Sequence, residues 1–98
     1  MIYSVKVRET VSSLVASVGF TAAQIPPTKP NVTYAIIQAI DGDVRFTVDG
    51  TTPVATTGLK LTRDSIVEIW GGKALTDFRC IDDGGTAKLE VVYMGQGG

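Results

Sequence analysis

The sequence predicts an all-β fold, namely an antiparallel β-sandwich or jelly-roll-like single domain with an N-terminal extended arm. Apolar residues recur at every second position in several short stretches, which is the period of a strand with one buried face. Turn-forming Asp-Gly and Gly-Gly pairs separate these stretches at close spacing. No stretch has the apolar spacing of a helix of ten or more residues. Together these observations favour a sandwich or barrel of short strands.

The clearest strands have one apolar face and one largely polar face, as in an antiparallel sheet. They are expected at residues 3–8, 43–49 and 88–93. Residues 34–40 (YAIIQAI) are apolar on both faces, which predicts a central strand that is covered on both sides. Further strands are expected at residues 66–70 and 78–81, with a short one at residues 59–61.

The N-terminal part differs in composition from the rest of the chain. Residues 1–30 are expected to be an arm with a proline-rich linker, and residues 31–98 a compact β domain, within one structural domain overall. Residues 9–25 fit a helical stripe and a strand about equally, and their serines and glycine favour the extended form. Residues 21–24 are expected to form a single helical turn. The linker after them is stiff, because proline fixes φ and restricts the residue before it.

The charge pattern limits the classes of partner. Nine basic and ten acidic residues are scattered along the 98-residue chain, for a net charge of -1. Nucleic-acid binding and polybasic membrane contact both draw on clustered Lys and Arg, so neither partner is expected. No segment resembles a signal peptide or a span of about 20 apolar residues. We therefore expect a soluble protein of a reducing cytoplasm, or of a particle assembled there.

Reactive chemistry is poorly represented, so an enzyme is not expected. The chain has no histidine, which is the commonest general base. The single cysteine, Cys80, lies in an apolar stretch and is expected to be a small buried hydrophobe. Asp41 and Asp43 form a conceivable carboxylate pair for glycoside hydrolysis, but a hairpin loop is the favoured interpretation. No catalytic, cofactor-binding or metal-binding residue is predicted.

Two glycine-containing motifs are interpreted as turns. The run Asp82-Asp83-Gly84-Gly85 lacks the alternating spacing of a calcium loop, and a solvated β-turn is favoured. Gly71-Gly72-Lys73 lacks the spacing of a phosphate-binding loop and is expected to be a tight turn.

The stretch FTVDGTTPVATTG is expected to be a long corner between strands. Its structural turn residues are Asp49, Gly50, Pro53 and Gly58. Farther along, Trp70 is interpreted in two ways. A core position is favoured, because large aromatics are usually buried. Otherwise Trp70 is the best candidate for an interface contact.

The run VRFTVDGTTPVATTG, followed by DFRCI and LEVVYM, resembles a group of small β-rich proteins encoded among bacteriophage and prophage virion genes. The similarity covers about residues 31–94. The matching positions are turns and core residues: Asp49, Gly50, Pro53, Gly58, Asp64, Phe78, Arg79, Ile81, Leu89, Val91 and Tyr93.

This resemblance implies a structural virion protein, assembled in the host cytoplasm. The function it favours is that of a capsid decoration (cement) protein, which binds the major capsid protein and stabilises the phage head. The alternatives are a tail or head-fibre accessory and a carbohydrate-binding β-sandwich module. The resemblance also implies a homo-oligomer, compatible with a trimer, in which the N-terminal arm could clasp a neighbour by strand addition.

Overall fold

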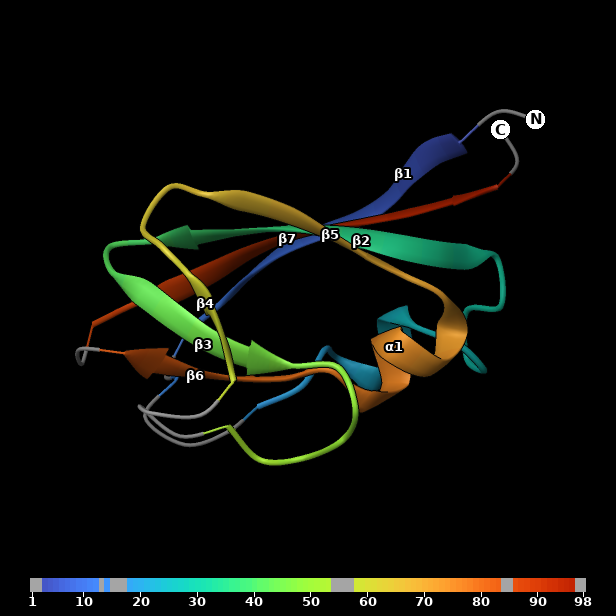
Figure 1. Ribbon diagram of the computed structural model, residues 1–98. Coiled ribbons are helices and arrows are strands. Elements are labelled where there is room, and N and C mark those ends of the chain that lie inside the picture. The colour runs from blue at the N-terminus through green and yellow to red at the C-terminus, as the bar shows by residue number, and fades with distance from the viewer. Residues whose placement is uncertain (1–2, 13, 15–17, 54–57, 84–85, 97–98) are drawn as a thin grey trace.

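Two antiparallel sheets pack face to face in this protein, which confirms the all-β sandwich (Figure 1). The computed structural model describes residues 3–12, 14, 18–53, 58–83 and 86–96. The larger sheet has the strand order β1-β7-β2-β5 and the smaller sheet the order β4-β3-β6. Most connections therefore cross between the layers, whereas β3 and β4 follow one another along the chain and pair directly.

The described residues form seven strands, and every strand predicted from the alternation is present. The larger sheet contains β1 (Tyr3–Val11), β2 (Val32–Ile40), β5 (Ile66–Trp70) and β7 (Lys88–Gln96). The smaller sheet contains β3 (Asp43–Thr47), β4 (Leu59–Leu61) and β6 (Arg79–Asp83). The predicted helical turn is confirmed as the 3-10 helix η1 (Ala22–Gln24).

The core lies between the sheets and follows the period of two. In β2, Ala35, Ile37 and Ala39 are fully buried, and they are paired with Tyr93, Val91 and Leu89 of β7, which are buried too. Three aromatic rings then fill the space between the layers. Phe20 stacks on Phe78 with centroids 4.1 Å apart, and Phe78 lies 5.8 Å from Phe46. Such offset aromatic contacts add to the stabilisation that comes from burial alone.

The N-terminal segment is extended, as expected, but it is part of the sheet rather than an arm that projects from the domain. β1 pairs with β7 along nearly its whole length, from Tyr3–Gln96 to Val11–Leu89. Strands from both sides of the predicted boundary at residue 30 thus belong to one sheet. The physical reason is that Val7 and Val11 lie on the core side and pack against the buried residues.

The chain after β1 crosses to the smaller sheet and closes one side of the sandwich (Figure 1). Val18 forms an antiparallel bridge with Cys80, with N–H to carbonyl distances of 2.8 and 3.0 Å. The Asp82 N–H donates to the Leu14 carbonyl at 3.0 Å. These bonds extend the smaller sheet beyond β6, so this side is covered by the chain itself.

Two local expectations are wrong. Gly71–Lys73 is not only a tight turn, because the helix α1 (Gly72–Asp77) follows directly and buries Leu75. Six residues with one buried side chain give no periodic repeat that the sequence could reveal. Asp41 and Gly42 do not close a hairpin either, because β2 and β3 belong to different sheets. Both residues have positive φ (62° and 155°) and turn the chain from one layer to the other.

Candidate docking surface

The larger sheet has an apolar surface on its outward side. Because successive residues of a strand point to opposite faces, the neighbours of the buried β2 and β7 residues point away from the core. The pairs Tyr34–Met94 and Ile36–Val92 are aligned across these two strands, and β5 adds Trp70 opposite Tyr34. No described element lies over this face (Figure 1). We call it the outer apolar face, defined by Tyr34, Ile36, Ile66, Trp70, Val92 and Met94. Two polar residues, Gln38 and Glu68, lie on the same side of the sheet beside Ile66, and Tyr34 is itself buried.

Trp70 is the most prominent residue of the outer apolar face. Its ring stacks on Tyr34 with centroids 3.8 Å apart and an interplanar angle of 10°. Its indole Nε1 donates to Glu68 Oε1 at 2.9 Å. The side chain is held on both sides yet stays 49% exposed, while Ile66 on the same strand is 63% exposed. The core position favoured for Trp70 is therefore wrong, and the alternative, an exposed aromatic residue, is what the structure contains.

The expectation that residues 34–40 are covered on both sides needs the same correction. Among the described residues, only the inner side of β2 is covered by a second layer, and Ile36 on the outward side is half-buried by its neighbours in the sheet. The apolar character of both faces was a correct observation. The second face simply lacks a covering layer in the described part of the chain.

Toward β1 the same face of the sheet becomes polar. Arg8 Nη2 lies 3.1 Å from Glu90 Oε1, and the Thr10 hydroxyl donates to Glu90 Oε2 at 3.0 Å. The charges here are balanced within the chain. The outer apolar face is thus confined to the β5, β2 and β7 side of the sheet, with a neutral polar margin along β1.

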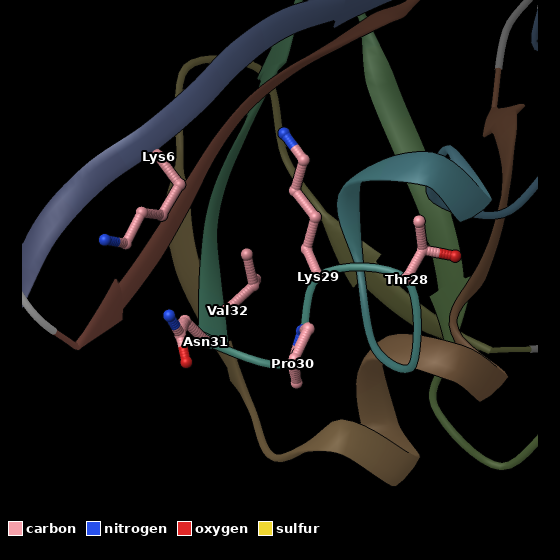
Figure 2. A pocket seen from close by; sticks show the side chains of 6 residues that line it. All are labelled: Lys6, Thr28, Lys29, Pro30, Asn31 and Val32. Carbon is pink, nitrogen blue, oxygen red and sulfur yellow. The ribbon is translucent and has the colours of Figure 1, made fainter.

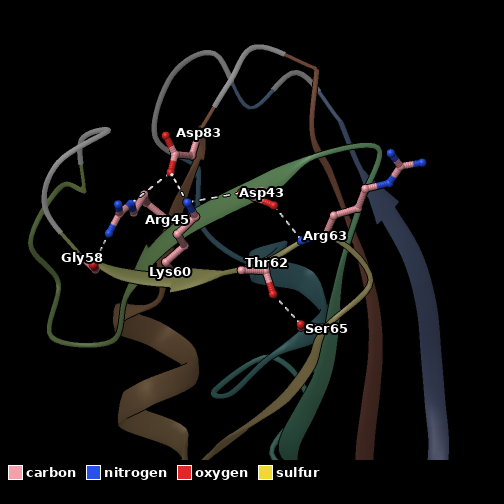
Figure 3. A network of polar contacts seen from close by, with 8 residues as sticks. All are labelled: Asp43, Arg45, Gly58, Lys60, Thr62, Arg63, Ser65 and Asp83. Carbon is pink, nitrogen blue, oxygen red and sulfur yellow. Dashed lines mark hydrogen bonds and ion pairs between the residues drawn. The ribbon is translucent and has the colours of Figure 1, made fainter.

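The outward side of the smaller sheet has the opposite chemistry (Figure 3). Lys60 Nζ lies 3.4 Å from Asp43 Oδ2 and 3.8 Å from Asp83 Oδ2, and Arg45 Nε donates to Asp83 at 3.2 Å. The Arg63 N–H donates to Asp43 Oδ1 at 2.7 Å. Two acidic and two basic side chains satisfy one another here, which leaves little unmatched charge for a partner.

Asp43 gives this network a pH dependence. The bond from the Arg63 N–H, aided by Lys60 and Arg45, holds the pKa of the Asp43 carboxyl below its ordinary value of 3.8. A group whose pKa is lower in the folded state stabilises the fold above its unfolded pKa. That contribution is lost as the pH falls through the folded pKa.

We therefore expect the urea midpoint of the wild type to fall more steeply between about pH 5 and pH 2 than that of Asp43→Asn. Every other carboxylate is present in both proteins. Equal pH slopes for the two proteins would contradict the role given to Asp43.

The predicted turn residues lie in a tightly bonded corner. The Asp49 carboxylate accepts bonds from the Thr51 N–H at 3.1 Å and from the Thr51 hydroxyl at 2.6 Å. Gly50 and Gly58 have φ of 85° and 111°, a region that glycine adopts without strain. Pro53 is buried. These contacts are within the loop and its neighbours, so the structural role is sufficient to explain them.

The acidic residues considered for catalysis or metal binding have other partners. Asp41 lies 3.5 Å from Lys88 Nζ, whereas Asp43 belongs to the network with Lys60. Asp83 is in β6 rather than in a free turn, and it pairs with Arg45. Within the described ranges, no three His, Cys, Asp or Glu side chains gather in a metal-binding arrangement. In the same ranges, no helix has the length and apolar character needed to cross a membrane.

Cys80 is buried in the core, as its apolar surroundings suggested. Burial raises the pKa of the Cys80 thiol from 9.0 to about 12. Because the thiolate is the reactive form, only roughly one molecule in ten thousand would carry it at pH 8. We expect an aromatic disulfide reagent to leave the folded protein unmodified at pH 8 and to react fully in 6 M guanidinium. Fast reaction of the folded protein would contradict this placement.

Sequence reasoning did not reveal the hollows of the surface. One, of about 310 Å³, lies between β1 and the proline-rich segment and is lined by Lys6, Lys29 and Asn31 among others. Its two ammonium groups do not converge on one point (Figure 2). A second, of about 330 Å³, lies beside the turn residues Asp49 and Gly58. A third, of about 270 Å³, lies between β4 and β5. None of them leaves a sequence motif, because each combines segments that are separated along the chain.

The fold and the two contrasting faces define a small β-sandwich with one apolar sheet face exposed. No family model, curated protein or solved structure matches this chain.

Proposed function

We propose that this protein has a structural role and docks onto another protein through the outer apolar face. The observation that carries the proposal is the exposed Trp70, which is held by Tyr34 and Glu68 at the end of the edge strand β5, beside the apolar residues of the sheet face. Contiguous apolar patches on soluble domains mark interaction sites more often than chance. Aromatic residues held in place before binding are typical interface hot spots.

The character of the face favours a protein partner over a lipid surface. Binding to anionic lipid draws on clustered Lys and Arg, and the margin of this face is a balanced pair, Arg8 with Glu90. The face also follows a pleated sheet from β5 across β2 to β7, with no deep hollow in it. A broad apolar surface with a polar margin suits another protein subunit.

At the finer level, we propose a capsid decoration protein that binds the major capsid protein and stabilises the phage head. This step is supported by the resemblance of residues 31–94 to small β-rich virion proteins. It is also compatible with the chemistry of the chain, which has no histidine and a single buried cysteine. Attachment to a tail or head fibre would use the same face.

The test is to mix the purified protein with undecorated capsids and to sediment them. Wild-type protein is expected to co-sediment and to raise the temperature at which the capsids open. Trp70→Ala is expected to weaken this association by at least about thirtyfold, the effect of losing a hot spot of 2 kcal/mol. Arg63→Ala is the control, because Arg63 is an exposed residue of the connection between β4 and β5 and is not part of the outer apolar face. Absence of co-sedimentation by the wild type would refute the finer proposal.

A carbohydrate-binding role is the second candidate, and the exposed Trp70 is the observation that favours it. An indole ring of this kind can also stack on a sugar. A glycan array separates the two functions: binding by the wild type and not by Trp70→Ala would favour the glycan, whereas a blank array leaves the protein partner.

A further inference from the structure

The sandwich is open along one side, between the edge strands β4 and β5. The opposite side is closed by the chain that crosses from β1 to β6, but here a hollow of about 270 Å³ remains. Leu59 at its margin is 60% exposed, although its strand neighbour Leu61 is buried. The lining comes from both layers and from α1, and it is apolar except for Glu68: Phe46, Val48, Leu59, Val67, Glu68, Ile69, Trp70 and Ala74.

The hollow adjoins a strand edge that is able to bind another strand. In an antiparallel pair, the backbone groups of every second residue point to the partner, and those of the residues between point away. The Gly71 N–H donates to the Thr33 carbonyl at 3.0 Å, in register with the β2–β5 pairing. The odd-numbered residues of β5 therefore bond to β2. The N–H and C=O groups of the even-numbered residues Ile66 and Glu68 point away from β2, toward the edge of the sheet.

We propose that an extended segment of another protein adds to β5 as a fifth strand of the larger sheet. Its backbone would bond to Ile66 and Glu68, and its inward side chains would enter the hollow beside Val67 and Ile69. Strand addition of this kind obtains affinity from main-chain bonds and specificity from pockets for alternate side chains. The inference rests on the proposed function, because it takes the partner to be a protein, and it adds where that partner is seated.

The outward positions of the added strand are specified by Glu68 and Trp70. The Glu68 carboxylate holds the indole N–H of Trp70 on the outward side of β5. A Lys or Arg opposite Glu68 would pair with this carboxylate and lie near the indole ring, a favourable arrangement for a cation. The occupant is therefore an alternating segment, with apolar residues facing inward and basic residues facing outward.

A second copy of this chain fits the edge poorly. Antiparallel pairing of two β5 strands over all five residues places Glu68 opposite Glu68 of the other copy. Like charges directly opposite one another destabilise a strand pair. The charge complementarity therefore selects a different, basic segment as the occupant.

The experiment is a titration of the full-length protein with the peptide acetyl-Thr-Val-Lys-Val-Lys-Val-Thr-amide. Trp70 is the only tryptophan, so its fluorescence reports on this edge directly. The alternating peptide is expected to bind saturably. A peptide with Glu in place of Lys, and a scrambled peptide of the same composition, are each expected to bind at least about tenfold more weakly.

Ile66→Pro removes one outward N–H without removing a bond to β2, and proline is tolerated at the first residue of an edge strand. Ile66→Ala is the matched control, because it loses the same side chain and keeps the N–H. We expect Ile66→Pro to lower the affinity for the peptide at least about tenfold more than Ile66→Ala does. Equal affinity for the two variants, or no binding by the wild type, would overturn the inference.

The outcome is separable from that of the proposed function. Capsid co-sedimentation without any peptide binding refutes the fifth strand and leaves the docking role. If the protein binds the peptide but does not co-sediment with capsids, the fifth strand is supported and the proposed capsid partner is refuted.

Discussion

Replacing Phe78 with alanine is expected to lower the free energy of unfolding by about 3–5 kcal/mol. The ring is fully buried and contacts both Phe20 and Phe46, so it joins the crossing N-terminal segment to the smaller sheet. Its removal leaves a cavity that the surrounding residues can fill only in part. Domains of this size are stable by only about 5–15 kcal/mol, so the variant would be close to unfolding.

Urea denaturation followed by far-UV circular dichroism measures this change. Val5→Ala is the control, because Val5 is exposed on β1 and its loss is expected to cost no more than about 0.5 kcal/mol. A cost below about 1 kcal/mol for Phe78→Ala would mean that the aromatic cluster is not the centre of the core.

Gly95→Ala is expected to be the most damaging change of a small residue. A Cβ at Gly95 would overlap the backbone carbonyl of Asn31, where β7 runs beside the start of β2. Backbone cannot move aside as a flexible side chain does, so we expect a loss of about 1–3 kcal/mol or more. The same denaturation experiment measures it.

Gly72→Ala is the matched control for this substitution. Gly72 begins α1, and the nearest atom to an added Cβ is Pro26 Cγ at 3.9 Å. Alanine favours a helix more than glycine does, so this variant is expected to be neutral or slightly stabilised. A Gly95→Ala protein as stable as Gly72→Ala would show that β7 and β2 are not as close as described.

The strands were predictable because their signal is local. Alternation in residues 43–49 and 88–93, together with Asp-Gly turns, reports which residues share a face. The pairing of β1 with β7 was not predictable, because it joins the two ends of the chain and depends on register rather than composition. The helix α1 was missed because a stretch of six residues is too short to show a helical period in the sequence.

The candidate site was only half visible in the sequence. Residues 34–40 are apolar on both faces, which indicates that two layers cover the strand, but not whether both layers belong to this chain. Whether Trp70 is buried or exposed depends on whether this chain supplies the second layer. The hollow beside β5 was invisible, since Leu59 and Val67 belong to different sheets and meet only in the folded protein.

Side-chain oxidation of the protein, free and bound to capsids, tests the docking role of the outer apolar face most directly. Hydroxyl radicals modify exposed Trp, Met and aliphatic side chains, and mass spectrometry locates the products. On binding, we predict that Trp70 and Met94 become protected while Ile81, on the outward side of the smaller sheet, stays as reactive as before. Protection of Ile81 with unchanged oxidation of Trp70 and Met94 would contradict the assignment of the docking face.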